Sequence, residues 1–232
     1  MSVTGTDSHS HATLGLALLS FAAGSMDAIA FFALGGVFTS AMSGNTIVLG
    51  IGIGQGHFNT ALHSFTAILG YVAGVGISSL SFAKFGRGSG WTLGVEVLFL
   101  AAFVALWIFA GTPASSLAMY SLISISAIAM GLQGGIARAI GVSGIMTVIF
   151  TSTYTVLASN FVERALAGDR PLLTVMAVRR LAALAAYLGG AVIAAIIVEH
   201  WRSFLPFPPF IAILVVFVGL KLRLITFDQN SA

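Results

Sequence analysis

Charged side chains are scarce in this sequence. They make up 7% of its 232 residues, whereas about a quarter of the residues in a typical soluble domain are charged. Hydrophobic residues reach 58%, and the mean hydropathy is +1.03. This composition excludes a soluble globular protein. It predicts an all-α, polytopic membrane protein with the lipid bilayer as its first partner, because helices satisfy their own backbone hydrogen bonds in a membrane.

Cysteine is absent, which excludes disulfides, thiolate chemistry and cysteine-ligated metals from this chain. The five histidines show no metal-ligand spacing, and the chain contains no GxGxxG, Walker A or G-x-S-x-G motif. We therefore expect no metal, no cofactor, no enzymatic activity and no ATP-driven pumping. The net charge of +3 is explained by basic cytoplasmic loops, so we expect no nucleic-acid partner.

Long apolar runs are abundant, and about 20 such residues span a bilayer core. Six runs qualify as predicted spans: Ala12–Leu34, Thr60–Ala83, Trp91–Ala110, Ser115–Arg138, Arg180–Val198 and Phe207–Leu220. Together they predict a single transmembrane domain over residues 12–226, preceded by a disordered cytoplasmic tail at 1–11. Two weaker segments would raise the count to eight if they also crossed.

The positive charges decide between these counts. If six segments cross and the N-terminus is inside, nine of the ten Lys and Arg residues face the cytoplasm, and Arg202 alone faces outward. With eight crossings the division becomes six to four. The positive-inside rule favours the six-span arrangement, which predicts that both termini are cytoplasmic.

The two weaker segments are Leu34–Gly54 and Gly141–Ser159, which are rich in Gly, Ser, Thr and Asn. Residues that break helices survive at membrane depth only where the backbone is buried in protein or lines a wet cavity. We therefore predict two broken or re-entrant segments. A half-helix beginning near Ser43 would direct free N–H groups at a ligand.

The two weak segments belong to an apparent internal repeat. Asp27 aligns with Gln133, Thr39 with Thr147, and Tyr71 with Tyr187. Each repeat, residues 12–111 and residues 115–226, contains in order a span, a broken segment and two further spans. Because three crossings are an odd number, the second repeat would be inverted relative to the first, an arrangement that recurs in transporters.

Asp27 lies in the middle of the first span. A carboxylate costs a few kcal/mol there and usually faces the bundle interior or a wet cavity. It could bind a proton or cation, or it could bond a neighbouring helix. Glu96 lies about one and a half turns into its span, where it could serve an ion pathway or reach the interface.

Other polar residues near the broken segments could line a path for a small polar or ionic solute. The alternatives are hydrogen bonding across closely packed helices and, for Arg138, anchoring at the cytoplasmic surface. The candidate pathway residues are Asp27, Ser43, Asn45, Thr46, Glu96, Gln133, Arg138, Thr151 and Thr153.

Four short motifs resemble those of the YoaK-like bacterial membrane proteins, the family called domain of unknown function 1275. They are Gly24-Ser25-Met26-Asp27-Ala28, Leu34-Gly35-Gly36-Val37-Phe38-Thr39, Met42-Ser43-Gly44-Asn45 and Met130-Gly131-Leu132-Gln133. The resemblance covers roughly Leu14 to Leu224 and implies an inner-membrane protein of about six spans. The chain departs from the family at Gly134-Gly135, where an Asn-Ala type pair is common, and in its single Arg138.

These features predict a small secondary transporter or channel-like protein for a small polar or ionic solute. Asp27 would bind the coupling ion, and the broken segments would line the site. The alternative is a membrane scaffold or sensor that transports nothing. A homo-oligomer is compatible with either function.

Overall fold

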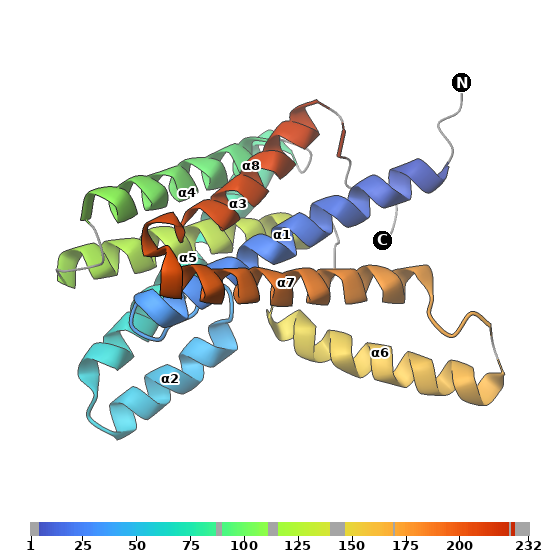
Figure 1. Cartoon of the computed structure of the whole chain (residues 1–232), viewed down its shortest axis with the longest axis horizontal. Helices are drawn as coiled ribbons and strands as arrows, with labels where there is room; N and C mark the ends of the chain where they lie inside the picture. Colours follow the sequence, from blue (N-terminus) through green and yellow to red (C-terminus); the bar gives the residue numbers. More distant parts are fainter. Residues whose placement is uncertain are drawn as a thin grey trace.

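The computed structural model describes residues 5–86, 90–110, 116–139, 147–168, 170–222 and 224–225. Every regular element within these ranges is a helix (Figure 1). The elements are α1 (Gly5–Ala33), α2 (Met42–Gly54), α3 (Phe58–Phe85), α4 (Trp91–Ala110), α5 (Ser116–Ala139), α6 (Thr147–Ala167), α7 (Val175–His200), the short 3-10 helix η1 (Arg202–Phe204) and α8 (Phe207–Lys221).

Six helical segments are long and apolar enough to cross a membrane, which confirms the predicted count. They are Thr13–Ala33, Phe58–Phe85, Trp91–Ala110, Ser116–Arg138, Val175–His200 and Arg202–Lys221. The α2 helix has 13 residues, too few to cross a hydrocarbon core that needs about 20. The α6 helix has 21 residues but is more polar than the six. The α1 helix begins at Gly5 and so extends through residues 5–11 of the predicted tail.

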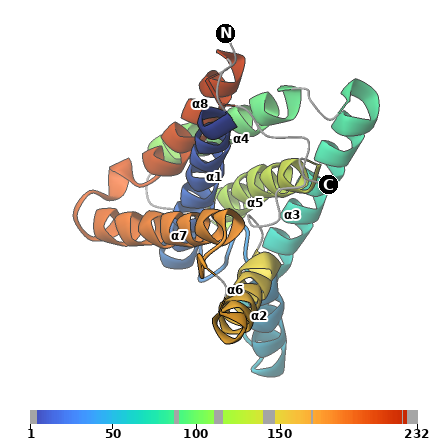
Figure 2. The ribbon, with the colours of Figure 1, turned by 90° about the vertical axis from the view of Figure 1, so that its right-hand side faces the viewer.

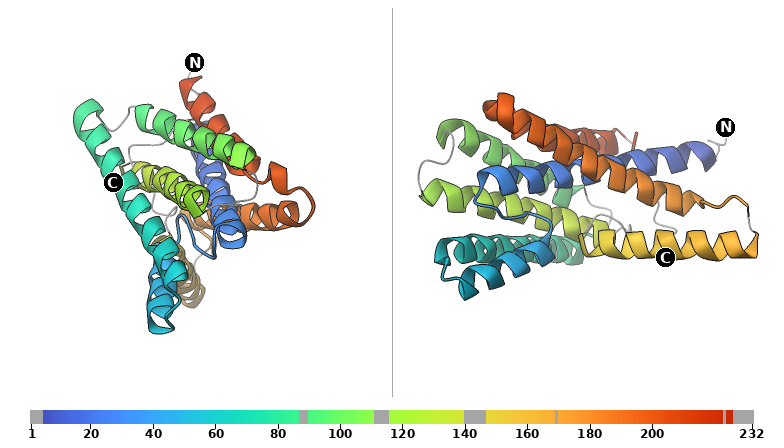
Figure 3. Two further views of the ribbon diagram at one scale, coloured as in Figure 1. Left: turned by 90° about the vertical axis from the view of Figure 1, so that its left-hand side faces the viewer. Right: turned by 60° about the horizontal axis from the view of Figure 1, so that its bottom comes forward.

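The six spans alternate in direction. In Figure 1, α1, α4 and α7 run from right to left, and α3, α5 and α8 run from left to right. The two remaining helices do not continue this alternation. Both α2 and α6 begin near the middle of the molecule and run outward to opposite ends, and their first turns lie close together (Figure 3, right).

The centre of the bundle is formed by α1 and α5, as the end-on view shows (Figure 2). Their spans are 67% and 56% buried, against 17% to 39% for the other four. The outer helices therefore leave most of their residues at least partly exposed, as expected of helices that contact lipid rather than water.

The most extensive helix pairs are α1 with α7 and α3 with α5. Glycine makes both approaches close, because a side chain at Gly24 on α1 would collide with the carbonyl oxygen of Tyr187 on α7. Likewise, a side chain at Gly131 on α5 would collide with the carbonyl of Tyr71 on α3. Small residues give membrane helices this kind of contact, in which packing rather than water exclusion stabilises the pair.

The first predicted broken segment is interrupted as expected. After α1 the chain turns at Gly35 and Gly36, whose φ angles of 84° and 77° suit glycine better than any other residue. Residues 34–41 then run back into the bundle without helical structure, and α2 begins at Met42, one residue before the predicted start. In the second segment, residues 141–146 lie outside the described residues, and α6 begins at Thr147.

Single cysteines in this Cys-free chain test the six-span arrangement. Gln55 and Ser203 are exposed at one end of the bundle, and Phe85 and Leu166 are exposed at the other. Because the positive-inside rule places the second end in the cytoplasm, Gln55→Cys and Ser203→Cys should react with an impermeant maleimide in intact cells. Phe85→Cys and Leu166→Cys should react only after permeabilisation. Eight crossings would instead expose Phe85→Cys and protect Gln55→Cys.

Candidate functional site

The carboxylate of Asp27 is 3% exposed and accepts five hydrogen bonds. Its Oδ1 accepts from the backbone N–H of Thr39 at 2.7 Å, the Thr39 hydroxyl at 3.0 Å and the backbone N–H of Ser40 at 2.7 Å. Its Oδ2 accepts from the hydroxyls of Ser40 and Tyr187, each at 2.6 Å. All five donors are uncharged, so hydrogen bonds rather than an ion pair compensate the burial of this group.

Asn45 binds the same re-entrant segment from the other side. It is fully buried in the first turn of α2. Its Oδ1 accepts from the backbone N–H of Phe38 at 2.8 Å, and its Nδ2 donates to the carbonyl of Phe38 at 2.6 Å. Gly44 leaves room for the Phe38 ring, which a side chain there would contact at 2.9 Å.

Together the two side chains satisfy backbone groups that no helix satisfies. Phe38, Thr39 and Ser40 lie between α1 and α2, where a buried N–H without a partner would cost about 1–3 kcal/mol. Asp27 accepts two of these N–H groups, and Asn45 accepts the third. The polar residues predicted to bind a solute thus first of all fix the path of the re-entrant backbone.

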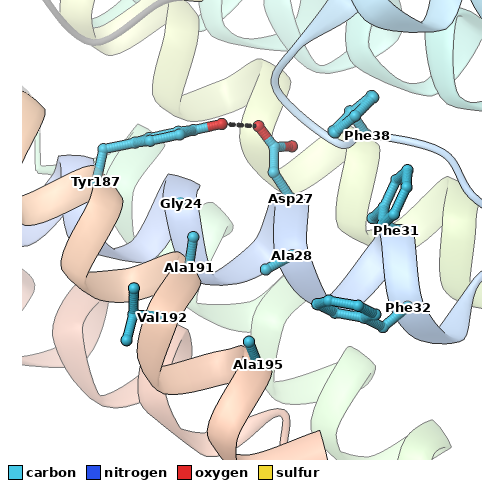
Figure 4. Close-up of a pocket in the computed structure, with 10 residues that line it drawn as sticks. All are labelled: Gly24, Asp27, Ala28, Phe31, Phe32, Phe38, Tyr187, Ala191, Val192 and Ala195. Atoms are coloured by element: carbon cyan, nitrogen blue, oxygen red, sulfur yellow. Dashed lines mark hydrogen bonds between the residues drawn. The ribbon is translucent and has the colours of Figure 1, made fainter.

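Beside Asp27 an open groove of about 380 Å³ lies between α1 and α7 (Figure 4). Phe31, Phe32 and Phe38 line one side, and side chains of α7 such as Ala191 and Val192 line the other. The lining is almost wholly apolar. The groove reaches Asp27 but does not include Asn45.

Gln133 and Arg138 lie on α5 at different depths. Gln133 is buried, and its Nε2 donates to the carbonyl of Leu19 on α1 at 2.8 Å. Its Oε1 has no hydrogen-bond partner among the described residues. Arg138 is exposed in the last turn of α5, as an interfacial anchor would be. Neither residue belongs to the groove.

Glu96 is fully buried on α4. Both of its carboxylate oxygens lack a hydrogen-bond partner among the described residues. It belongs neither to the groove nor to the Asp27 cluster.

The hydroxyl residues of the two half-helices differ in burial. Ser43 and Thr46 are exposed in the first turns of α2, and the Thr46 hydroxyl donates to the Met42 carbonyl of its own helix at 2.9 Å. On α6, Thr151 is exposed and Thr153 is buried. The close approach of α2 and α6 brings the beginnings of both helices together, and none of these hydroxyls is among the five donors to Asp27.

Three residues of the cluster were not predicted as site residues. Thr39 and Ser40 supply four of the five hydrogen bonds to Asp27, and Tyr187 supplies the fifth from α7. The alignment of Tyr71 with Tyr187 was the available signal for Tyr187, but its partner depends on the α1–α7 packing. In the part of the chain that the structure describes, no three His, Asp or Glu side chains are grouped to hold a metal.

Comparison with known proteins gives two matches. The family described as "Protein of unknown function (DUF1275)" matches residues 15–219. The chain is also 31% identical over 213 residues to the UPF0700 transmembrane protein YoaK of Bacillus subtilis (strain 168), covering 90% of this chain and 94% of that relative. No solved structure matches the chain.

Replacements of Asp27 should separate hydrogen bonding from charge. An asparagine oxygen can keep the three bonds to Oδ1, and its NH₂ group can donate to the two hydroxyls at Oδ2, which can reverse their roles. Asp27→Asn should therefore lower the free energy of unfolding by only about 1 kcal/mol. Asp27→Leu strands two buried backbone N–H groups and should lower it by on the order of 3 kcal/mol.

Thermal unfolding of the purified variants in detergent provides the measurement. Tyr187→Phe is the matched control, because it removes one of the five donors and should resemble Asp27→Asn in its effect. Equal melting temperatures for Asp27→Leu and the wild type would contradict the anchoring role.

Proposed function

The chain belongs to the DUF1275 family of membrane proteins, and on that premise we propose that it is a small secondary transporter or channel-like protein. Its cargo would be a small polar or ionic solute. We place it in the bacterial inner membrane with both termini in the cytoplasm, in line with its charge distribution. The observation that carries the proposal is the half-helix α2, which begins inside the bundle and next to the beginning of α6.

Half-helices suit transport because their N-terminal N–H groups point at the place where a solute would sit. The α2 helix begins at Met42 without a side-chain cap, and its Met42 N–H donates to the Ser40 carbonyl at 3.0 Å. The positive dipole end of the helix would attract a polar or anionic group. Ser43 is exposed at this end and could replace a water ligand of the solute. Discontinuous helices that meet near the bilayer midplane form the substrate sites of several transporter folds.

An inverted repeat is part of the proposal. Its support is a pair of similar contacts, each of which joins a helix of one half to a helix of the other. Tyr187 on α7 bonds Asp27 on α1, and the Tyr71 hydroxyl on α3 lies against Gly134 on α5. Gly24 and Gly131 make the matching helix contacts. In this repeat Gly134, and not Gln133, takes the place of Asp27, so the carboxylate is present in one half alone.

A membrane scaffold or sensor without transport is the second candidate. It is favoured by the five hydrogen bonds that occupy Asp27 and by the apolar lining of the groove beside it. In such a protein the polar residues would fix helix positions and nothing else. The structural role of Asp27 is therefore the same in a transporter and in a scaffold. The transport proposal depends instead on α2 and α6.

Uptake into proteoliposomes tests transport directly. A panel of labelled sugars, amino acids, organic anions and inorganic ions should reveal at least one solute that enters faster than it enters protein-free vesicles under a proton or sodium gradient. Ser43→Val should then reduce that uptake by about fivefold, because one hydrogen bond is worth about 1 kcal/mol.

Ser79→Val is the matched control for Ser43→Val. Ser79 is also an exposed helical serine, but its hydroxyl donates to the Val75 carbonyl of its own helix α3. Uptake by Ser79→Val should equal that of the wild type. Failure of the whole panel to enter above background would favour the scaffold.

A further inference from the structure

Glu96 is an acidic side chain in the interior of the bundle, and its surroundings differ from those of Asp27. It lies on the face of α4 that also buries Leu93, Leu100 and Phe103, the face turned toward the bundle. Its side chain is 0% exposed, and neither carboxylate oxygen has a hydrogen-bond partner among the described residues. Asp27, which is also buried, has five.

This difference bears on whether the Glu96 side chain is protonated or ionised inside the bundle. An ionised carboxylate taken from water into an apolar interior without compensation loses tens of kcal/mol of solvation, and such a group takes up a proton instead. Hydrogen bonds from five donors can stabilise the charge on Asp27, but nothing described can do so for Glu96. The two residues therefore differ. Asp27 is an anchor held by hydrogen bonds, whereas no described group stabilises the ionised form of Glu96.

A pair of hydroxyl groups joins α3 to α4 one turn before Glu96. Thr92, one turn before it on α4, donates to the Ser81 hydroxyl of α3 at 2.9 Å. Because α3 and α4 run in opposite directions, one further turn along each brings Ser78 to the level of Glu96. Ser78 is fully buried against Gly135 of α5, and its hydroxyl also lacks a described partner.

No positive charge compensates Glu96 in the described part of the chain. At this end of the bundle Lys84, Arg138 and Lys221 are exposed, and the Lys221 ammonium lies 5.7 Å from the Phe217 ring, beside Gly90. None of the three forms an ion pair with Glu96. The titratable or charged groups on the three helices packed against α4 are His63, Tyr71 and Lys84 of α3, Tyr120 and Arg138 of α5, and Lys221 of α8.

The remaining groups lie elsewhere. His63 and Tyr120 stack on each other, 5.0 Å between ring centroids, in the first halves of α3 and α5 and so at the opposite end of the bundle from Glu96. The Tyr71 hydroxyl lies against Gly134.

We propose that Glu96 is a proton-binding site, in which the side chain holds a proton in the resting protein and exchanges it with water at the α3–α4 end. Release breaks the carboxyl O–H bond, passes the proton to water and leaves the carboxylate, and uptake reverses the step. The hydrogen-bonded Thr92–Ser81 pair lies between Glu96 and that end and provides a relay. Coupling of this proton to a solute rests on the proposed transport function, whereas the site itself does not.

Dicyclohexylcarbodiimide is the chemical probe for the site. It enters apolar regions, where the O–H of a protonated carboxyl group adds across one of its C=N bonds. The O-acylisourea formed then rearranges by an oxygen-to-nitrogen acyl shift to a stable N-acylurea, so no group leaves. On the purified wild-type protein at neutral pH, peptide mass spectrometry should locate the modification at Glu96 and not at Asp27. The modification should fall to background in Glu96→Gln and as the pH is raised.

Infrared spectroscopy provides a second measurement that needs no variant. The wild type should show a carboxylic-acid C=O band that shifts in D₂O and is lost at high pH. An unmodified Glu96 together with the absence of this band would overturn the proposal. Protection of Glu96 by Na⁺ but not by choline at constant pH would also overturn it, because the site would then bind a metal cation.

Uptake measurements on the same protein keep the two proposals apart. If Glu96 is labelled and proton-driven uptake is lost in Glu96→Gln while solute exchange without a gradient persists, the site couples the proton to the solute. If Glu96 is labelled and no solute enters even the wild-type vesicles, the transport proposal fails and the proton site stands. Equal proton-driven uptake by the wild type and Glu96→Gln would overturn the coupling role.

Discussion

Between α1 and α2 the backbone leaves its helix inside a bundle of apolar side chains, and the hydrogen bonds to Asp27 make this possible. The carboxylate accepts the N–H groups of Thr39 and Ser40 and is also bonded to Tyr187 on α7. One side chain thereby joins the first span, the re-entrant segment and the seventh helix. Without it, the backbone N–H groups of Thr39 and Ser40 would be buried without a hydrogen-bond acceptor, at a depth where water does not replace one.

The residues around this anchor serve the same arrangement. Gly24, one turn before Asp27, allows the close approach of α7 that brings Tyr187 within reach. Gly44 and Asn45 do the same for Phe38, the first by leaving space for its ring and the second by binding its backbone. Gly24, Asp27, Gly44 and Asn45, which belong to the motifs that carry the family resemblance, are thus explained by helix packing and backbone hydrogen bonding, independently of any solute.

Hydropathy and residue type predicted the spans and the position of the first break. The span count depends on sums over about 20 residues, which tolerate errors at single positions, and the turn was marked by Gly35 and Gly36. The partners of Asp27 could not be predicted, because Tyr187 meets it only after α1 and α7 pack. Alignment paired Asp27 with the polar Gln133, whereas the tyrosine contacts favour Gly134. For Glu96, the distance from the helix end gave its depth but not which side of α4 faces the core.

Amide hydrogen exchange at Thr39 and Ser40 tests most directly whether Asp27 holds the re-entrant segment. In the wild type both amides should exchange slowly although they lie outside any helix, because each donates to a buried carboxylate. In Asp27→Leu their exchange should accelerate by at least about tenfold, the equivalent of ~1.4 kcal/mol, while amides in the middle of α4 keep their wild-type rates. Fast exchange of both amides in the wild type, unchanged by the substitution, would contradict the account.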